Sequence, residues 1–139
     1  MSIAILGAGA FGTALAITLA QNGPVQLWAR NADQADQMQR TRQNAARLPG
    51  ATLPENVSVT ADIARALGAD VLLLAMPMQQ MGGFLNTHAT ALAGKTLVSC
   101  SKGIDLASGQ GPTALIEAIC PTARAMVLTG PSFAADIAR

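Results

Sequence analysis

The stretch Ile3-Ala4-Ile5-Leu6-Gly7-Ala8-Gly9-Ala10-Phe11-Gly12 decides the fold of this chain. A short apolar run leads directly into three glycines with Gly-x-Gly-x-x-Gly spacing, and a helical stretch, 13–21, follows. In this setting the first glycine permits a tight turn, the second lets the backbone approach a diphosphate, and the third lets helix and strand pack closely. Free N–H groups and the dipole at the helix start would hold the phosphates. The pattern predicts a dinucleotide-binding unit, and a glycine turn without ligand is the alternative.

The rest of the chain alternates short apolar runs with longer helical stretches, which is typical of a parallel sheet with crossover helices. We expect strands at 3–6, 25–29, 57–60, 71–76, 96–100 and 125–129, and helices at 13–21, 33–42, 62–67, 78–92 and 112–119. Gly82-Gly83 lies inside the expected helix 78–92 and lowers its helix propensity, so a bend at this pair is as compatible with the sequence as a straight helix. Stretch 43–56, with Pro49-Gly50 and Pro54, is expected to be irregular. The expected fold is α/β: a Rossmann-like, doubly wound, mainly parallel sheet with helices on both faces, residues 1–139 forming one domain.

Composition limits the classes of function. Half of the 139 residues are hydrophobic, 12% are charged and the net charge is +1, so the chain is not intrinsically disordered. Near-zero charge without a basic run argues against nucleic acid or a membrane surface as partner. No apolar run approaches the ~20 residues that cross a bilayer, and no basic segment precedes the first one, which predicts a cytoplasmic protein. Cys100 and Cys120 lack metal-ligand spacing, so we expect reduced, buried thiols and no metal.

Distinctive side chains follow the carboxyl ends of the expected strands, where open α/β sheets bind ligands. Arg30 stands where an acidic residue would accept hydrogen bonds from the ribose 2′-hydroxyl. A guanidinium there can bind a phosphate, which favours NADP, with NAD or a merely solvated charge as alternatives. Lys102 can bind a substrate oxygen and polarise a carbonyl during hydride transfer, unless it is a surface lysine. His88, the sole histidine, is expected at the surface, away from this edge.

Four stretches resemble the bacterial type of NAD(P)-dependent glycerol-3-phosphate dehydrogenase, and the likeness runs the whole length of the chain. They are Gly7-Ala8-Gly9-Ala10-Phe11-Gly12-Thr13-Ala14-Leu15-Ala16, Leu27-Trp28-Ala29-Arg30, Ser101-Lys102-Gly103-Ile104 and Thr129-Gly130-Pro131-Ser132-Phe133-Ala134-Ala135-Asp136. A fifth, Asn44-Ala45-Ala46-Arg47-Leu48-Pro49-Gly50, is similar to the family's Asn-x-x-aromatic-Leu-Pro loop. Arg47 departs from it, because the family usually has Tyr or Phe at this position.

The resemblance implies interconversion of dihydroxyacetone phosphate and sn-glycerol 3-phosphate with NAD(P)(H), feeding glycerophospholipid synthesis. With the three glycines, the implied cofactor-binding residues are Gly7, Gly9, Ala10, Phe11, Gly12, Arg30, Lys102 and Ala134. The implied substrate-binding residues are Lys102, Gly130 and Ser132.

No catalytic residue is expected within this chain, because the family's proton-transferring lysine lies in a second, helical domain. We therefore expect these 139 residues to be the cofactor domain, binding cofactor with little or no turnover. The expected partner is a small-molecule substrate, with a homodimer left open. The alternatives are another Rossmann-type reductase, of the ketopantoate or hydroxyacid type, and a stand-alone NAD(P)-sensing module.

Overall fold

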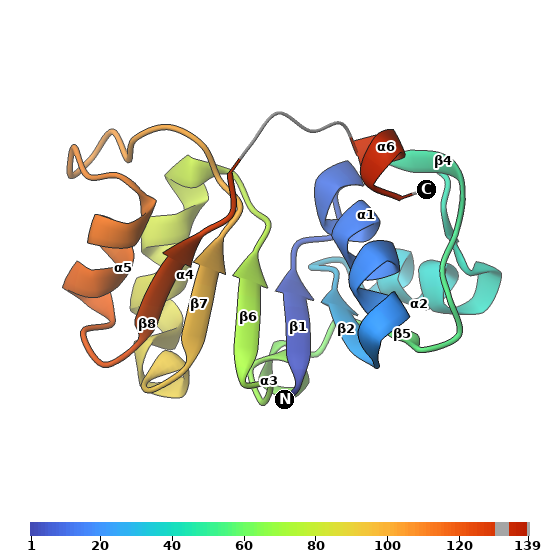
Figure 1. Ribbon diagram of the computed structural model, residues 1–139, viewed down its shortest axis with the longest axis horizontal. Coiled ribbons are helices and arrows are strands. Elements are labelled where there is room, and N and C mark those ends of the chain that lie inside the picture. The colour runs from blue at the N-terminus through green and yellow to red at the C-terminus, as the bar shows by residue number, and fades with distance from the viewer. Residues whose placement is uncertain (130–133, 139) are drawn as a thin grey trace.

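The computed structural model describes residues 1–129 and 134–138. Figure 1 shows one twisted sheet with helices packed against it. In chain order the elements are β1 (Ile3–Leu6), α1 (Ala10–Leu19), a short 3-10 helix η1 (Ala20–Asn22), β2 (Val25–Trp28), α2 (Ala32–Thr41), β3 (Gln43–Asn44), β4 (Leu48–Thr52), β5 (Val57–Thr60), α3 (Ile63–Ala66), β6 (Val71–Leu74), α4 (Met78–Leu92), β7 (Thr96–Ser99), α5 (Pro112–Ile119), β8 (Arg124–Val127) and α6 (Ala134–Ile137).

The main sheet has six strands in the order β5-β2-β1-β6-β7-β8, and every neighbouring pair is parallel. Counted along the chain, this is the 3-2-1-4-5-6 order of a doubly wound dinucleotide-binding sheet. The Rossmann-like fold expected from the sequence is therefore confirmed. The strand order reverses between β1 and β6, so the carboxyl ends of these two strands mark the crevice in which such folds bind ligands.

Side chains alternate across β1, and this alternation divides the core into two layers. Ile5 packs into a buried cluster with residues of α1 and α2, whereas Ala4 and Leu6 pack into a second cluster with residues of α3, α4 and α5. Ile5 and Leu6 are fully buried. Burial of each such aliphatic side chain contributes about 1.5–3 kcal/mol. The two clusters hold β1 in the centre of the sheet and fix the place of the turn that follows it.

Stretch 43–56 differs from the expectation, because it contains the antiparallel pair β3–β4. Pro49 and Gly50 lie inside β4, and they are tolerated there because a two-stranded ladder has an unpaired side on each strand. Arg42, with φ 59°, ends α2, and its guanidinium donates to the carbonyls of Pro54 and Val57, the latter at 2.7 Å. A non-local side-chain contact therefore closes this excursion.

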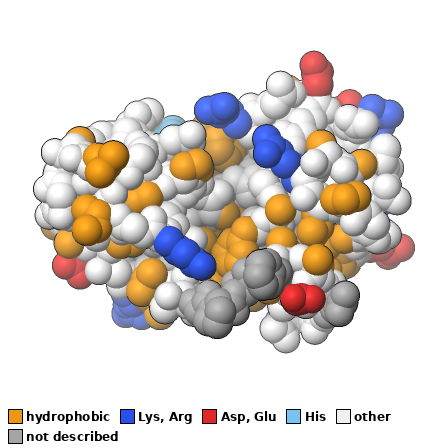
Figure 2. All heavy atoms as spheres, turned by 90° about the horizontal axis from the view of Figure 1, so that it is seen from above, with side chains coloured by type: hydrophobic (Ala, Val, Ile, Leu, Met, Phe, Trp, Pro, Cys, Tyr) orange, Lys and Arg blue, Asp and Glu red, His pale blue; other side chains and the backbone are white. Residues whose placement is uncertain are grey.

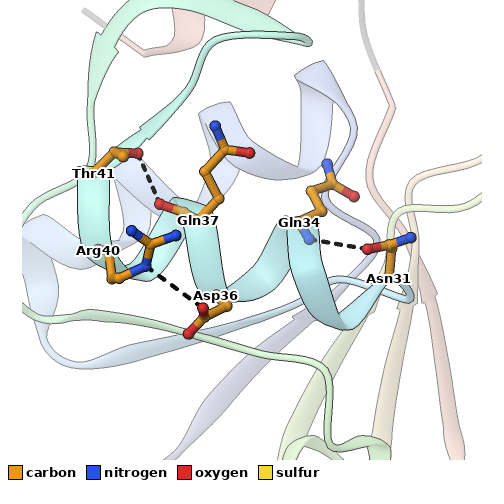
Figure 3. A network of polar contacts seen from close by, with 6 residues as sticks. All are labelled: Asn31, Gln34, Asp36, Gln37, Arg40 and Thr41. Carbon is orange, nitrogen blue, oxygen red and sulfur yellow. Dashed lines mark hydrogen bonds and ion pairs between the residues drawn. The ribbon is translucent and has the colours of Figure 1, made fainter.

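Several helix boundaries also differ from the expectation. Helix α1 begins at Ala10, so the third glycine of the turn lies inside it, and α4 departs from helical geometry at His88 rather than at its glycine pair. Helix α2 begins at Ala32, one residue before the expected start, and its N-cap Asn31 accepts the N–H of Gln34 at 3.0 Å (Figure 3). Helix α6 is an additional element that no expected helix covers.

Two further features of residues 1–129 and 134–138 bear on function. No helix there has both the length and the apolar character needed to span a bilayer. The same residues contain no group of three or more His, Cys, Asp or Glu side chains placed to hold a metal ion.

Candidate functional site

The turn between β1 and α1 has two positions that accept only glycine. Gly7 has φ +128°, and a Cβ there would lie closer than 3.0 Å to the carbonyl oxygen of Ala75. A Cβ on Gly12 would lie equally close to the carbonyl oxygen of Gly7. Gly9 is different, because nothing lies within 4 Å of the place that its Cβ would occupy. The turn is therefore tight on the protein side and open on the outer side, at Gly9.

The start of α1 offers N–H groups to that open space. Gly9 is the N-cap, and no side chain caps this helix. Helices α2 and α3 differ, because Asn31 and Asp62 accept N–H groups from their first turns. Uncapped N–H groups at a helix N-terminus favour an anion such as a phosphate. The turn thus has the geometry that the glycine spacing predicted for a diphosphate site.

Asn44 fixes the shape of this turn from outside the main sheet. Its side-chain amide donates to the carbonyl of Ala8 and to Oγ1 of Thr13, both at 2.9 Å. Both Asn44 and Thr13 are buried. The amide therefore joins the residue before Gly9 to the first turn of α1. Asn44 opens the stretch that is similar to the family's Asn-x-x-aromatic-Leu-Pro loop, and its sequence context alone predicts no role for its side chain.

Two cavities flank the turn at the carboxyl ends of the strands. The first has a volume of about 580 Å³ and the second about 700 Å³. Gly9, Ala75, Met76 and Pro77 line both, so the cavities adjoin one another at the glycine turn. Figure 2 looks onto this end of the sheet and shows a hollow with apolar side chains inside it and Lys and Arg side chains around it.

The structure distributes the predicted site residues between the two cavities. Gly9, Ala10, Phe11, Gly12 and Lys102 line the first, whereas Gly7, Gly9 and Arg30 line the second. Ala134, at the start of α6, packs against the hydrophobic cluster beside α1 and is not among the lining residues, although Ile137 of the same helix lines the first cavity. Gly130 and Ser132 lie outside the described residues.

The segment that carries Lys102 is anchored on both sides. The Ser101 hydroxyl donates to the carbonyl of Met76. On the other side, the Gln79 amide donates to the carbonyl of Ile104 at 2.8 Å and accepts the N–H of Leu106 at 2.9 Å. Lys102 itself is exposed. Its backbone is therefore tied to the start of α4, while its ammonium group is available to a ligand in the first cavity.

Several other side chains that could have had a role in the site contact other parts of the protein instead. His88 lines neither cavity and packs on the ring of Phe84, with a centroid distance of 4.7 Å. Lys95 has a partner within the protein, because its Nζ donates to the carbonyl of Ala69 at 2.8 Å. Met78 and Met81 are buried in the core, where a flexible thioether side chain can fill irregular gaps.

Comparison with known proteins agrees with this geometry. Residues 2–139 match the family described as NAD-dependent glycerol-3-phosphate dehydrogenase N-terminus. The chain belongs to this family. Glycerol-3-phosphate dehydrogenases (NAD(P)+) of Ruegeria sp. (strain TM1040) and Roseobacter denitrificans are 62% and 57% identical to it, over 99% and 100% of its length. A crystal structure of glycerol-3-phosphate dehydrogenase from Coxiella burnetii, 29% identical, superposes over 99% of the chain with a TM-score of 0.90.

The chain spans only part of these dehydrogenases. It covers 43% of the Ruegeria and Roseobacter proteins and 43% of the Coxiella chain. The family resemblance seen in the sequence is therefore confirmed for the N-terminal, NAD-binding domain.

Replacing Asn44 tests its role as the link between the turn and α1. We expect Asn44→Ala to lower the free energy of unfolding by about 1–3 kcal/mol, because the Ala8 carbonyl and the Thr13 hydroxyl each lose a partner where water has little access. Urea denaturation followed by circular dichroism measures this change. The exposed Asn86→Ala, which loses a bond within α4 only, is the control. Equal losses in the two variants would contradict the assigned role.

The thiol of Cys100, in the wall of the first cavity, is expected to be unreactive at neutral pH. Cys120 is buried as expected, whereas Cys100 is only half-buried. Partial burial still disfavours the thiolate and raises the pKa of Cys100 to about 11. At pH 8 only about one thiol in a thousand is then ionised, and maleimide labelling should accelerate roughly tenfold per pH unit up to pH 10. Peptide mass spectrometry separates this site from Cys120. Labelling of the folded chain at the rate of an unfolded control would contradict the prediction.

Proposed function

We propose that this chain binds NAD(P)(H) across the two cavities, with the diphosphate at Gly9. One observation carries the proposal: the open space at Gly9 lies at the uncapped start of α1, where the two cavities adjoin. A dinucleotide has a dianionic bridge between two ring systems, and this arrangement provides a place for each of the three parts. The order of strands supports the same site, because the crevice lies where that order reverses.

The side chains in each cavity assign the two ends of the dinucleotide. The adenosine end belongs to the second cavity, where Arg30 follows β2 and the rings of Trp28 and Phe84 supply apolar walls. The nicotinamide end belongs to the first cavity, where Phe11 supplies an apolar wall and Lys102 a cation. The residues directly after β2, Ala29-Arg30-Asn31-Ala32, include no acidic residue that could bind a ribose 2′-hydroxyl. The guanidinium of Arg30 at that place supports NADP over NAD.

We propose further that the chain is the cofactor domain of an enzyme that interconverts sn-glycerol 3-phosphate and dihydroxyacetone phosphate. A nicotinamide bound in the first cavity would supply or accept the hydride at C2 of the triose phosphate. Lys102 holds the substrate oxygen and stabilises the charge that develops on it. Gly130 and Ser132 bind substrate, and the proton is transferred by a lysine of a further domain. The names of the relatives and their greater length support this assignment. A cytoplasmic location, a homodimer and the absence of nucleic-acid partners stay predictions.

Two glycine variants test whether the open space at Gly9 belongs to the nucleotide. Gly9 and Gly111 are both helix N-caps, with φ/ψ of −75°/−172° and −74°/177°, and neither Cβ would meet an atom within 4 Å. Gly9→Ala should leave the melting temperature unchanged and weaken NADPH binding at least tenfold, because the methyl group takes the place of a phosphate oxygen. Gly111→Ala should change neither. Calorimetry, or quenching of the sole tryptophan, Trp28, measures the affinity.

Each outcome of this test is informative. Unchanged affinity in Gly9→Ala would contradict the placement of the diphosphate. Absence of binding of either nucleotide to the folded wild-type chain would contradict the proposed function altogether.

Lys102 can be tested in the full-length enzyme. Lys102→Met should lower kcat/KM for dihydroxyacetone phosphate at least a hundredfold, because the charge forming on the substrate oxygen loses its cation. Lys95→Met is the matched control, since Lys95 lies outside both cavities. Oxidation of NADPH followed by absorbance gives both values. A loss of less than tenfold for Lys102→Met would show that this lysine is peripheral to the reaction.

A further inference from the structure

A second arginine shares the adenosine cavity with Arg30. Arg47 lies in the tight turn between β3 and β4, and both arginines line the second cavity. They come from separate parts of the fold, one from the end of β2 and one from the excursion that follows α2. Two arginines that are 17 positions apart in the sequence therefore line the same cavity.

The backbone that carries Arg47 is fixed relative to the glycine turn. The N–H of Arg47 donates to the carbonyl of Asn44 at 3.2 Å, and the side chain of Asn44 holds Ala8 and Thr13. The next residue, Leu48, is buried in the core. Arg47 is thus presented to the cavity by the same residue that shapes the diphosphate site, so its position relative to a bound nucleotide is set by the fold.

Neither guanidinium is neutralised by the protein. Across residues 1–129 and 134–138, no carboxylate forms an ion pair with Arg30 or Arg47, and no Asp or Glu lines the second cavity. Both arginines are exposed. Two unpaired cations at one cavity raise the local potential and favour a multiply charged anion between them. A phosphate monoester suits them, because guanidinium groups bind its oxygens in bidentate fashion.

We propose that Arg47 is a specificity-determining residue that binds, together with Arg30, the 2′-phosphate on the adenosine ribose of NADP(H). This inference rests on the proposed nucleotide site. It adds Arg47 to that site, at a position where the family usually has an aromatic residue. NADH has a hydroxyl group at the same place and leaves both cations without a partner. Arg47 therefore contributes to the difference between the two nucleotides rather than to the binding of their common parts.

Affinities for both nucleotides in matched variants test the proposal. Arg47→Gln should weaken NADPH binding at least tenfold and NADH binding less than twofold. Arg124→Gln is the control, because it removes an equal charge at the amino end of β8, away from both cavities. Melting temperatures should stay unchanged, since both side chains are exposed. Trp28 quenching or calorimetry in low-salt buffer gives the dissociation constants.

The adenosine half alone provides a second measurement. Adenosine 2′,5′-bisphosphate should compete with NADPH better than adenosine 5′-phosphate does, and Arg47→Gln should remove most of that advantage. Added salt should weaken NADPH more steeply than NADH, and less so in Arg47→Gln, because the extra interaction is between exposed charges. Combining Arg30→Gln with Arg47→Gln should cost less than the sum of the single losses if both residues hold one phosphate.

The outcomes separate this inference from the proposed function. Equal losses of NADPH and NADH in Arg47→Gln would show that the guanidinium stacks on adenine or supports the loop, and would overturn the inference. Unchanged NADPH affinity in that variant would overturn it as well. In both cases the wild-type chain still binds nucleotide, so the proposed function stands. Failure of the wild type to bind either nucleotide contradicts the proposed function itself.

Discussion

The close contact between the backbones of Gly7, Gly12 and Ala75 is the constraint on which the rest of the structure depends. No side chain fits between the turn, the first turn of α1 and the end of β6. Because these three backbones meet, the N-terminus of α1 lies directly over the place where the strand order reverses. A wider separation would leave room for a side chain but would move the helix N–H groups away from the crevice. The close packing of the core and the anion site therefore have the same origin.

The two hydrophobic clusters and the β3–β4 excursion also hold the glycine turn in place. The clusters hold β1 from both faces, so the turn cannot shift along the sheet. The excursion reaches the turn from outside, through the side-chain amide of Asn44. Its own shape depends on Arg42, which binds two carbonyls beyond β4. A segment without a strand in the main sheet thus shapes the candidate site and also presents a cation to it.

The local sequence pattern predicted those elements whose position does not depend on polar contacts with distant residues. The six strands, their parallel class and the glycine turn follow from apolar runs and spacing, because burial on both faces requires such runs. The roles of Asn44 and Arg42 could not be predicted, since each depends on carbonyls that only the folded chain brings near. The non-helical backbone at His88 was not predicted either. Glycine lowers helix propensity at Gly82-Gly83, yet the backbone departs from helical geometry where His88 packs on Phe84.

The site separates residues that hold the fold from residues that face a ligand. Gly7, Gly12 and Asn44 are fixed by contacts inside the protein, so their replacement acts on stability and on binding together. The exposed cations Arg30, Arg47 and Lys102 have no described carboxylate partner and contribute little to stability. Substitution at these cations can therefore change which anionic group is bound without changing the fold. In the proposed site, exposed cations at the rim of the crevice would choose between nucleotides that differ by a single phosphate, while the backbone would stay the same.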